Sequence, residues 1–305
     1  MIGKDGIILF DKSFLQLLNP REAEVLNQHK TFVCSQLQDE ILGNLAKKDE
    51  SGKGRDFFTE LASKLPQDAR YTYDSFTLCA LNLLGHNINL IGKIPELNLT
   101  ELVQYDPKII FKYICEQRLQ KNVDQQVIEI SMQRKKIIEI MMPEYFRLYL
   151  LPELTKADYS PKTCKDLSQA KAMAESYLLE TKPEVLLEQI FKILQVEQVP
   201  FFENKGNEIS NLWKDKIYKE MKEIAPYAAF VLNVEIFFQI ALNAGESLKI
   251  EGNSLSDIRY LHYLPFCKYF VSHDKLHIRC ASIFMREDQE FILGSNFKNM
   301  LKSVI

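Results

Sequence analysis

The chain has 305 residues and a formal net charge of -3, and 46% of its residues are hydrophobic. This length suggests about two domains, or one domain with a large insertion, and the apolar content is sufficient for a substantial core. The near-neutral charge excludes a protein coated with basic residues. A nucleic-acid binder of this composition must therefore rely on local patches and metal ions.

Cysteine usage and apolar segments indicate a cytoplasmic protein. No C-x-x-C pair occurs among the six cysteines, which are Cys34, Cys79, Cys115, Cys164, Cys267 and Cys280. This predicts buried free thiols in a reducing compartment. The first residues lack the charged-then-apolar pattern of a signal peptide. The longest apolar run, Ala225–Ala244, contains Pro226, Asn233 and Glu235, which predicts a core helix rather than a membrane span.

The beginning of the chain predicts a strand–helix–strand–helix arrangement. Gly6–Phe10 is a short apolar run that stops at Asp11, as in a strand buried on both faces. Helical spacing follows, and Thr31–Cys34 is a second short strand. Ser35 can cap the next helix, whose apolar stripe runs to Leu45. This order is typical of the opening of an α/β sheet.

The middle of the chain is predicted to be almost wholly helical. Residues 49–56 are polar and contain glycine, which indicates a loop or a domain boundary. From residue 57 to 224, apolar spacings of three and four predict helices near residues 72–85, 107–142, 166–180, 183–195 and 208–244. No internal repeat or low-complexity tract is present.

The last part of the chain returns to mixed structure. Ser254 or Ser256 can cap a helix that reaches Leu264 and ends near Pro265. Tyr269–Ser272 and Glu290–Leu293 are predicted strands, and residues 297–304 a short final helix.

Four carboxylates lie where an α/β sheet places functional groups. Asp11 ends the first strand, and Glu40 lies in the second long helix. Asp257 begins a later helix, and Asp274 follows the strand Tyr269–Ser272. Ligands of open α/β sheets bind outside the carboxyl ends of the strands. Clustered carboxylates repel one another unless a hard cation such as Mg²⁺ or Mn²⁺ neutralises them, and two such ions can activate water and stabilise the leaving oxygen of a phosphodiester.

The same residues carry a family resemblance. The segment from Ile7 to Gln16 resembles the opening strand and Asp of PIN-like nuclease domains, and Val33–Leu45 resembles their second helix with its acidic ligand, here Glu40. The segment from Asp257 to His277 resembles the closing block of that family, an Asp, a helix, a strand and then Ser-x-Asp. These pieces cover roughly residues 1–48 and 225–305.

The resemblance implies a three-layer α/β/α fold with a parallel sheet, a divalent metal and phosphodiester hydrolysis, most often of RNA. Its ligands would be Asp11, Glu40, Asp257 and Asp274, with Ser13 and Ser272 as hydrogen-bonding partners of the ligands. The PIN-like core would comprise residues 1–54 and 225–305, and residues 55–224 would form a helical insertion. Glu235, in an apolar helix, either faces the metal as a further ligand or pairs with a cation or a helix end.

Each acid also has a plain structural interpretation. Asp11 and Asp257 can cap the helices that follow them. Glu40 lies beside Asp39, and either can belong to a solvated helix face. These interpretations explain the acids one at a time but not their arrangement as a set.

Two other kinds of site are set aside. His273 and His277 have the spacing of a helical zinc pair, but the Glu of an H-E-x-x-H hydrolase is missing. A phosphatase with Asp11 as nucleophile would need a second Asp two residues later, where this chain has Ser13. His262 is expected to be a packed histidine.

Basic residues gather in three places. The first group follows the second long helix and can bind the phosphate backbone of a nucleic acid. The second group lies in the helical region. The third group alternates with acidic residues and is better explained as a solvent-exposed helix face. The three groups are Lys47, Lys48, Lys53 and Arg55; Arg134, Lys135 and Lys136; and Lys214, Lys216, Lys219 and Lys222.

The sequence thus predicts a Mg²⁺- or Mn²⁺-dependent nuclease, with RNA as a more expected substrate than DNA. The alternative is a non-catalytic PIN-like scaffold whose helical insertion binds a protein partner. A third hypothesis, by family analogy alone, is a toxin or defence effector restrained by another protein.

Overall fold

The structure is a computed structural model that describes residues 6–46, 60–66, 69–93, 95, 148, 150–156, 159–196, 199, 202–244, 248 and 255–304. Its contacts divide the chain into two compact units. The sheet unit comprises Met1–Asp74, Asn89–Gln133 and Arg259–Ile305. The helical unit comprises Ser75–Ile88 and Arg134–Ile258.

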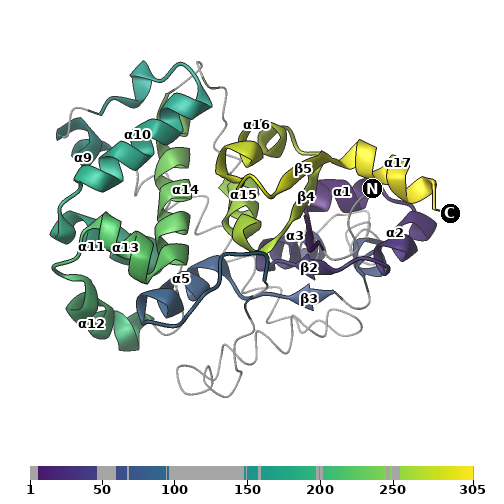
Figure 1. Ribbon diagram of the computed structural model, residues 1–305, viewed down its shortest axis with the longest axis horizontal. Helices are drawn as coiled ribbons and strands as arrows, with labels where there is room; N and C mark the ends of the chain where they lie inside the picture. The colour runs from purple at the N-terminus through teal and green to yellow at the C-terminus, as the bar shows by residue number, and fades with distance from the viewer. Residues whose placement is uncertain are drawn as a thin grey trace. The chain divides into compact units, whose positions relative to one another are not determined.

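The sheet unit is built on parallel strands in the order β3-β2-β1-β4-β5. They are β1 (Ile8–Phe10), β2 (Thr31–Val33), β3 (Arg70–Tyr71), β4 (Tyr269–Ser272) and β5 (Glu290–Leu293) (Figure 1). Every residue of β1, β2 and β4 is buried, as expected for parallel strands covered on both faces. Ile8 of β1 lies opposite Thr31 on one side and Tyr269 on the other, so the two ends of the chain share one sheet.

Helices follow the strands of this unit. They are α1 (Lys12–Leu17), α2 (Pro20–Leu26), α3 (Ser35–Ala46), the 3₁₀ helix η5 (Arg259–Phe266), α16 (Lys275–Phe284) and α17 (Gly294–Lys302). Helix α17 packs against α1 and α2, whereas α3 and α16 both contact η5. Asp11, Asn19 and Asp274 cap α1, α2 and α16 by accepting hydrogen bonds from backbone N–H groups of the first turn. A helix start leaves these donors unpaired, so the caps fix where each helix begins.

The helical unit is organised around one apolar helix, α14 (Pro226–Asn243), which packs against α5 (Ser75–Leu83), α10 (Leu167–Glu180) and α13 (Tyr218–Ile224) (Figure 1). Its other described elements are α9 (Leu151–Lys156), the 3₁₀ turn η2 (Pro161–Thr163), α11 (Pro183–Val196), α12 (Phe202–Trp213) and α15 (Leu255–Ile258). By length and composition α14 could cross a membrane, but 72% of this 18-residue helix is buried inside the structure. It is therefore a core helix of this unit, as its polar interruptions predict.

The fold is mixed α/β, with a small parallel sheet and mostly helical content, as the sequence predicts. The strands expected at the two chain ends are confirmed. The prediction of an almost wholly helical stretch from 57 to 224 is wrong at β3, because a two-residue strand is too short to show the alternation of a strand. The expected helix over 208–244 is divided into α12, α13 and α14, and the one expected over 107–142 lies outside the described residues.

The division of the chain differs from the expected one at residues 55–74 and 89–133, which belong to the sheet unit, and at residues 225–258, which belong to the helical unit. Its main element, α14, buries its apolar side chains against α5, α10 and α13. An apolar helix can cover either a sheet or other helices, and its periodicity does not distinguish the two.

Candidate functional site

The order of the strands identifies one edge of the sheet as the natural place for a site. From β1, the chain adds β2 and β3 on one side, and then β4 and β5 on the other. Ligands of open α/β sheets bind at such a reversal, beyond the carboxyl ends of the two strands that flank it. Asp11 directly follows β1, and His273 and Asp274 directly follow β4. Residues far apart in sequence therefore meet at the switch point between β1 and β4.

Asp11 is the most enclosed acid of this edge, with only 2% of its surface exposed. It accepts hydrogen bonds from the backbone N–H of Phe14 (2.9 Å) and from the Ser13 hydroxyl (2.7 and 2.8 Å to its two oxygens). Its Oδ2 also accepts from Ser272 Oγ (2.7 Å) and lies 3.1 Å from His277 Nδ1. Burial alone would raise the pKa of Asp11, but its bond to His277, the charge of that ring and the bonds from Ser272 and Phe14 lower it below the usual value. Asp11 is therefore held as a carboxylate.

A network of hydrogen bonds joins the ends of β1 and β4 around Asp11. Ser272 Oγ lies 2.8 Å from His277 Nδ1 and accepts from the Asp274 backbone N–H (3.0 Å). Ser13 Oγ accepts from the backbone N–H of His273 (3.0 Å). The expectation that Ser13 and Ser272 support the acid is thus matched by their contacts. The network is not a serine-hydrolase relay, because Ser272 and Asp11 meet the same nitrogen of His277, whereas a relay needs them on opposite nitrogens.

His277 is the residue of this network that sequence reasoning missed. Its side chain is fully buried, and its ring packs edge-on against Tyr260 and Phe270, with centroids 5.3 and 5.0 Å away. The sequence feature that could have identified it is its position on the apolar face of α16, which also contains Leu276, Cys280, Ala281 and Phe284. His273, by contrast, is exposed, so the two histidines do not form the zinc pair that their spacing first suggested.

Glu40 lies on α3 beside Asp11. Its carboxylate accepts hydrogen bonds from Gln36 Nε2 (3.1 Å) and the Tyr260 hydroxyl (3.2 Å), and Lys12 Nζ lies 3.8 Å away. Burial raises the pKa of Glu40, and the negative charge of Asp11 contributes to that rise, against the opposing effects of Lys12, Gln36 and Tyr260. The two carboxylates, which we call the acid pair, are therefore close enough to repel each other.

The other two expected acids differ in their placement. Asp274 is half-buried and caps α16 through Oδ1, which accepts from the backbone N–H groups of Leu276 (2.7 Å) and His277 (3.3 Å). It is tied to the acid pair through Ser272. Asp257 lies half-buried in the first turn of α15, in the helical unit. Glu235, an outside candidate, is buried in α14 of that same unit.

Among the described residues, no three His, Cys, Asp or Glu side chains are grouped so that they could share an ion. A hard cation such as Mg²⁺ needs only one or two carboxylates, with waters completing its octahedron. The acid pair supplies that number, and its mutual repulsion is the electrostatic condition that a cation relieves. The residues present at the switch point therefore fit a sparsely ligated, largely hydrated ion rather than an all-protein cage.

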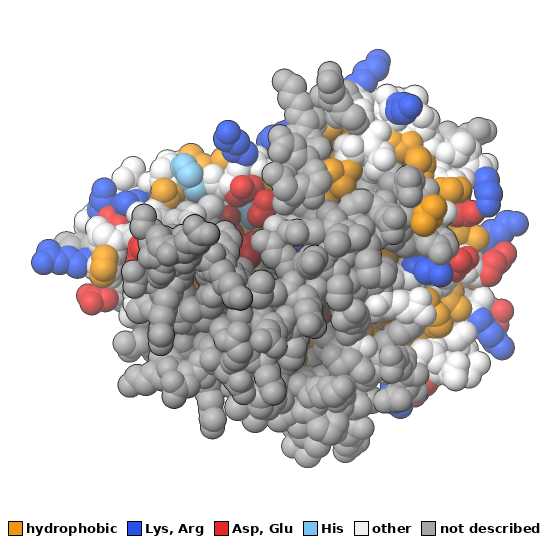
Figure 2. Space-filling view, turned by 180° about the vertical axis from the view of Figure 1, so that it is seen from behind, with side chains coloured by type: hydrophobic (Ala, Val, Ile, Leu, Met, Phe, Trp, Pro, Cys, Tyr) orange, Lys and Arg blue, Asp and Glu red, His pale blue; other side chains and the backbone are white. Residues whose placement is uncertain are grey.

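Basic groups do not form a broad patch in the described part of the chain. Lys214, Lys219 and Lys222 are exposed, but Asp215 and Glu223 are exposed among them, as a solvated face predicts. Figure 2 shows one face of the molecule, on which the described Lys and Arg side chains are scattered, several of them beside acidic ones. The other two groups, Lys47, Lys48, Lys53 and Arg55 and then Arg134, Lys135 and Lys136, lie outside the described residues.

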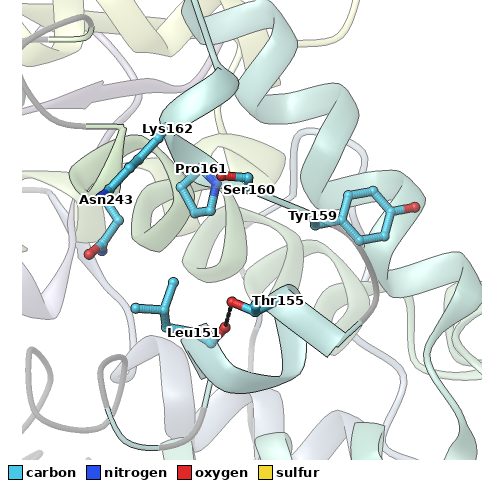
Figure 3. A pocket seen from close by; sticks show the side chains of 7 residues that line it. All are labelled: Leu151, Thr155, Tyr159, Ser160, Pro161, Lys162 and Asn243. Atoms are coloured by element: carbon cyan, nitrogen blue, oxygen red, sulfur yellow. Dashed lines mark hydrogen bonds between the residues drawn. The ribbon is translucent and has the colours of Figure 1, made fainter.

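The helical unit contains a pocket of ≈ 390 Å³ of quite different character (Figure 3). Its lining is Leu151, Thr155, Tyr159, Ser160, Pro161, Lys162 and Asn243, of which only Lys162 is charged. None of these described lining residues carries a carboxylate, the ligand that a hard divalent cation prefers.

Comparisons with protein-family models, with curated proteins and with solved structures find no match to this chain.

Proposed function

We propose that this protein is a divalent-metal-dependent nuclease with a PIN-like α/β/α core. The observation that carries the proposal is the acid pair at the switch point of a parallel sheet. Tyr260 donates to Glu40, and its ring lies 5.3 Å from the ring of His277, which contacts Asp11. The parallel order of the strands and the helices that pack around them support the PIN-like core. RNA as the substrate rests on the resemblance of the chain ends to that family.

The residues that would hold the ion are Asp11 and Glu40, and Asp274 joins the same network through its backbone N–H, which donates to Ser272. Mg²⁺ or Mn²⁺ bound there would supply an activated water and neutralise charge that develops on a phosphodiester. Ser13, Ser272 and His277 fix the Asp11 carboxylate in one orientation and keep it ionised. Tyr260 and Gln36 orient Glu40 by donating to its two oxygens. Such supporting contacts set the geometry and the basicity of metal ligands.

Glu40→Gln is the sharpest test of this site. It removes one negative charge while leaving an oxygen that can accept from Tyr260 or Gln36. Thermal unfolding of the full chain is measured with and without millimolar Mn²⁺. Binding at 100 times the dissociation constant stabilises a folded protein by about 2.7 kcal/mol, so the midpoint of the wild type should rise with Mn²⁺ and that of Glu40→Gln should not.

Glu24→Gln is the matched control, because Glu24 is an exposed glutamate in the same unit. It should respond to Mn²⁺ as the wild type does. In a cleavage assay on single-stranded RNA with Mn²⁺, Glu40→Gln should lose on the order of 100-fold or more, since even partners of metal ligands contribute that much. Full activity in Glu40→Gln would disprove the assignment.

The second candidate function is a non-catalytic scaffold. Two observations favour it: both Asp11 oxygens already accept hydrogen bonds, and a lysine pairs with Glu40. The helical unit also exposes Leu179 (53%), Ile217 (41%) and Ile224 (51%), apolar groups that a protein partner would cover. A wild type that neither responds to Mn²⁺ nor cleaves RNA would support the scaffold.

A further inference from the structure

Lys12 is the cation of the candidate site. It is the first residue of α1, directly after Asp11, and its Nζ lies 3.8 Å from Glu40 Oε2. That distance is longer than a hydrogen bond, so the contact is electrostatic. The lysine side chain is 26% exposed and that of Glu40 14%, whereas Asp11 is 2% exposed. Lys12 is therefore the most exposed of the three charged groups.

The charges around Glu40 explain the position of this ammonium. The negative charge of Asp11 acts on Glu40 from within the fold, and the positive charge of Lys12 opposes it. Ser272 and His277 contact Asp11, and Lys12 is the ammonium that pairs with Glu40. The compensating cation at Glu40 is thus Lys12, held by charge alone on a flexible four-carbon stem.

We propose that Lys12 is a tethered counter-ion that occupies the cation position of the acid pair until a divalent ion displaces it. The inference rests on the proposed function, since it concerns the ion that the acid pair would bind. With Lys12 in place the repulsion between the carboxylates is reduced. The apparent affinity for an external cation is then the intrinsic affinity multiplied by the fraction of molecules in which Lys12 has left the site. Metal loading then requires the lysine to turn outward into solvent.

The test compares three lysine variants of the full chain by titration with Mn²⁺, using the loss of the free Mn²⁺ EPR signal as the measure of binding. Lys12→Gln removes the charge and keeps the length of most of the stem. Lys12→Arg keeps the charge. Lys275→Gln is the matched control, because Lys275 is an exposed lysine that likewise begins a helix directly after a capping Asp.

We expect Lys12→Gln to bind Mn²⁺ more tightly than the wild type, on the order of tenfold, because a competing unit charge near the site has been removed. Lys12→Arg and Lys275→Gln should bind as the wild type does. Without Mn²⁺, Lys12→Gln should melt below the wild type because the acid pair has lost its cation, and Mn²⁺ should restore its midpoint. In a Glu40→Gln background, which should not bind Mn²⁺, Lys12→Gln should not restore binding, because the site has lost one of its two carboxylates.

The outcomes separate this inference from the proposed function. Equal or weaker Mn²⁺ binding by Lys12→Gln, with clear binding by the wild type, would overturn the counter-ion and leave the metal site standing. Binding of Mn²⁺ by Lys12→Gln but not by the wild type would also support the counter-ion, because it would mean that Lys12 keeps Mn²⁺ out of the wild-type site altogether. No binding by either protein would overturn both proposals.

Discussion

Asp11 performs two tasks that seemed to be alternatives when only its sequence position was known. It caps α1 through Phe14 and lies at the switch point with its charge stabilised by His277 and Ser272. A carboxylate that caps a helix is thereby fixed in one rotamer, which is also what a metal ligand requires. The structural and functional interpretations of this residue are therefore compatible.

Asp11→Asn should destabilise the fold at neutral pH by about 1–3 kcal/mol. The amide keeps only one acceptor oxygen, and its NH2 group would meet donors that now bond to the second carboxylate oxygen. The folded pKa of Asp11 lies below its ordinary value of 3.8, so the stability due to this group is present above that value and is lost as pH falls through the lower, folded pKa. The difference in unfolding free energy between wild type and Asp11→Asn should shrink accordingly.

Urea unfolding from pH 7 down to about pH 3 measures this difference. Other carboxylates titrate in the same range, but they are common to both proteins and cancel in the comparison. A difference that stays constant across the range would contradict the depressed pKa.

At the scale of elements, the start of α14 depends on a residue from another helix. Asn82, at 2% exposure, accepts through Oδ1 from the backbone N–H groups of Tyr227 (3.0 Å) and Ala228 (3.2 Å). Its Nδ2 donates to the carbonyl of His86 (2.9 Å). Ala225, at the capping position of α14 itself, has no side-chain acceptor. Asn82 on α5 therefore supplies the cap that the sequence of α14 lacks.

Asn82→Ala should lower the unfolding free energy by about 1–3 kcal/mol, since two buried N–H groups lose their acceptor. Asn243→Ala is the control at the other end of the same helix, where Asn243 makes one hydrogen bond, to Gln239 O, and is only half-buried. Its effect should be clearly smaller. Denaturant unfolding of both variants gives the comparison, and equal effects would show that the cap is unimportant.

At the scale of the whole chain, the sheet unit is closed by contacts between its two ends. Glu22 of α2 is 1% exposed and pairs with two lysines of α17, Lys298 (3.4 Å) and Lys302 (3.9 Å). Lys298 also donates to the carbonyl of Leu17. The apolar side of this contact includes Phe14 against Phe297, with ring centroids 5.5 Å apart. The final helix therefore completes the core begun by the first residues.

Lys298→Met should destabilise the protein by about 1–3 kcal/mol, because it leaves the buried Glu22 with the more distant Lys302 as its cation. Lys275→Met, at an exposed lysine of α16, should change stability by less than about 0.5 kcal/mol. When Lys298→Met is introduced into a Glu22→Gln variant, it should lower the unfolding free energy by much less than it does in the wild type. Additive effects would rule out the pairing as the cause.

The local pattern of the sequence was sufficient for the strands at the two chain ends and for two of the acids. Ile8–Phe10 and Tyr269–Ser272 are apolar runs of the length of a buried strand, and each is followed within two residues by the Asp that caps the next helix. Periodicity and capping act within a few residues, so they can be recognised without knowledge of the fold. By themselves they predicted an α/β sheet with Asp11 and Asp274 at its carboxyl edge, and the family resemblance added that the sheet is parallel.

Only the tertiary structure decided what surrounds those acids. His277 reaches Asp11 across 266 positions of the chain, and Tyr260 reaches Glu40 across 220. The pairing of β3 and the assignment of α14 to the helical unit likewise depend on which distant surfaces meet. No local pattern encodes such contacts, because they arise from packing of whole elements, and the charge balance between Glu40 and Lys12 follows from that packing.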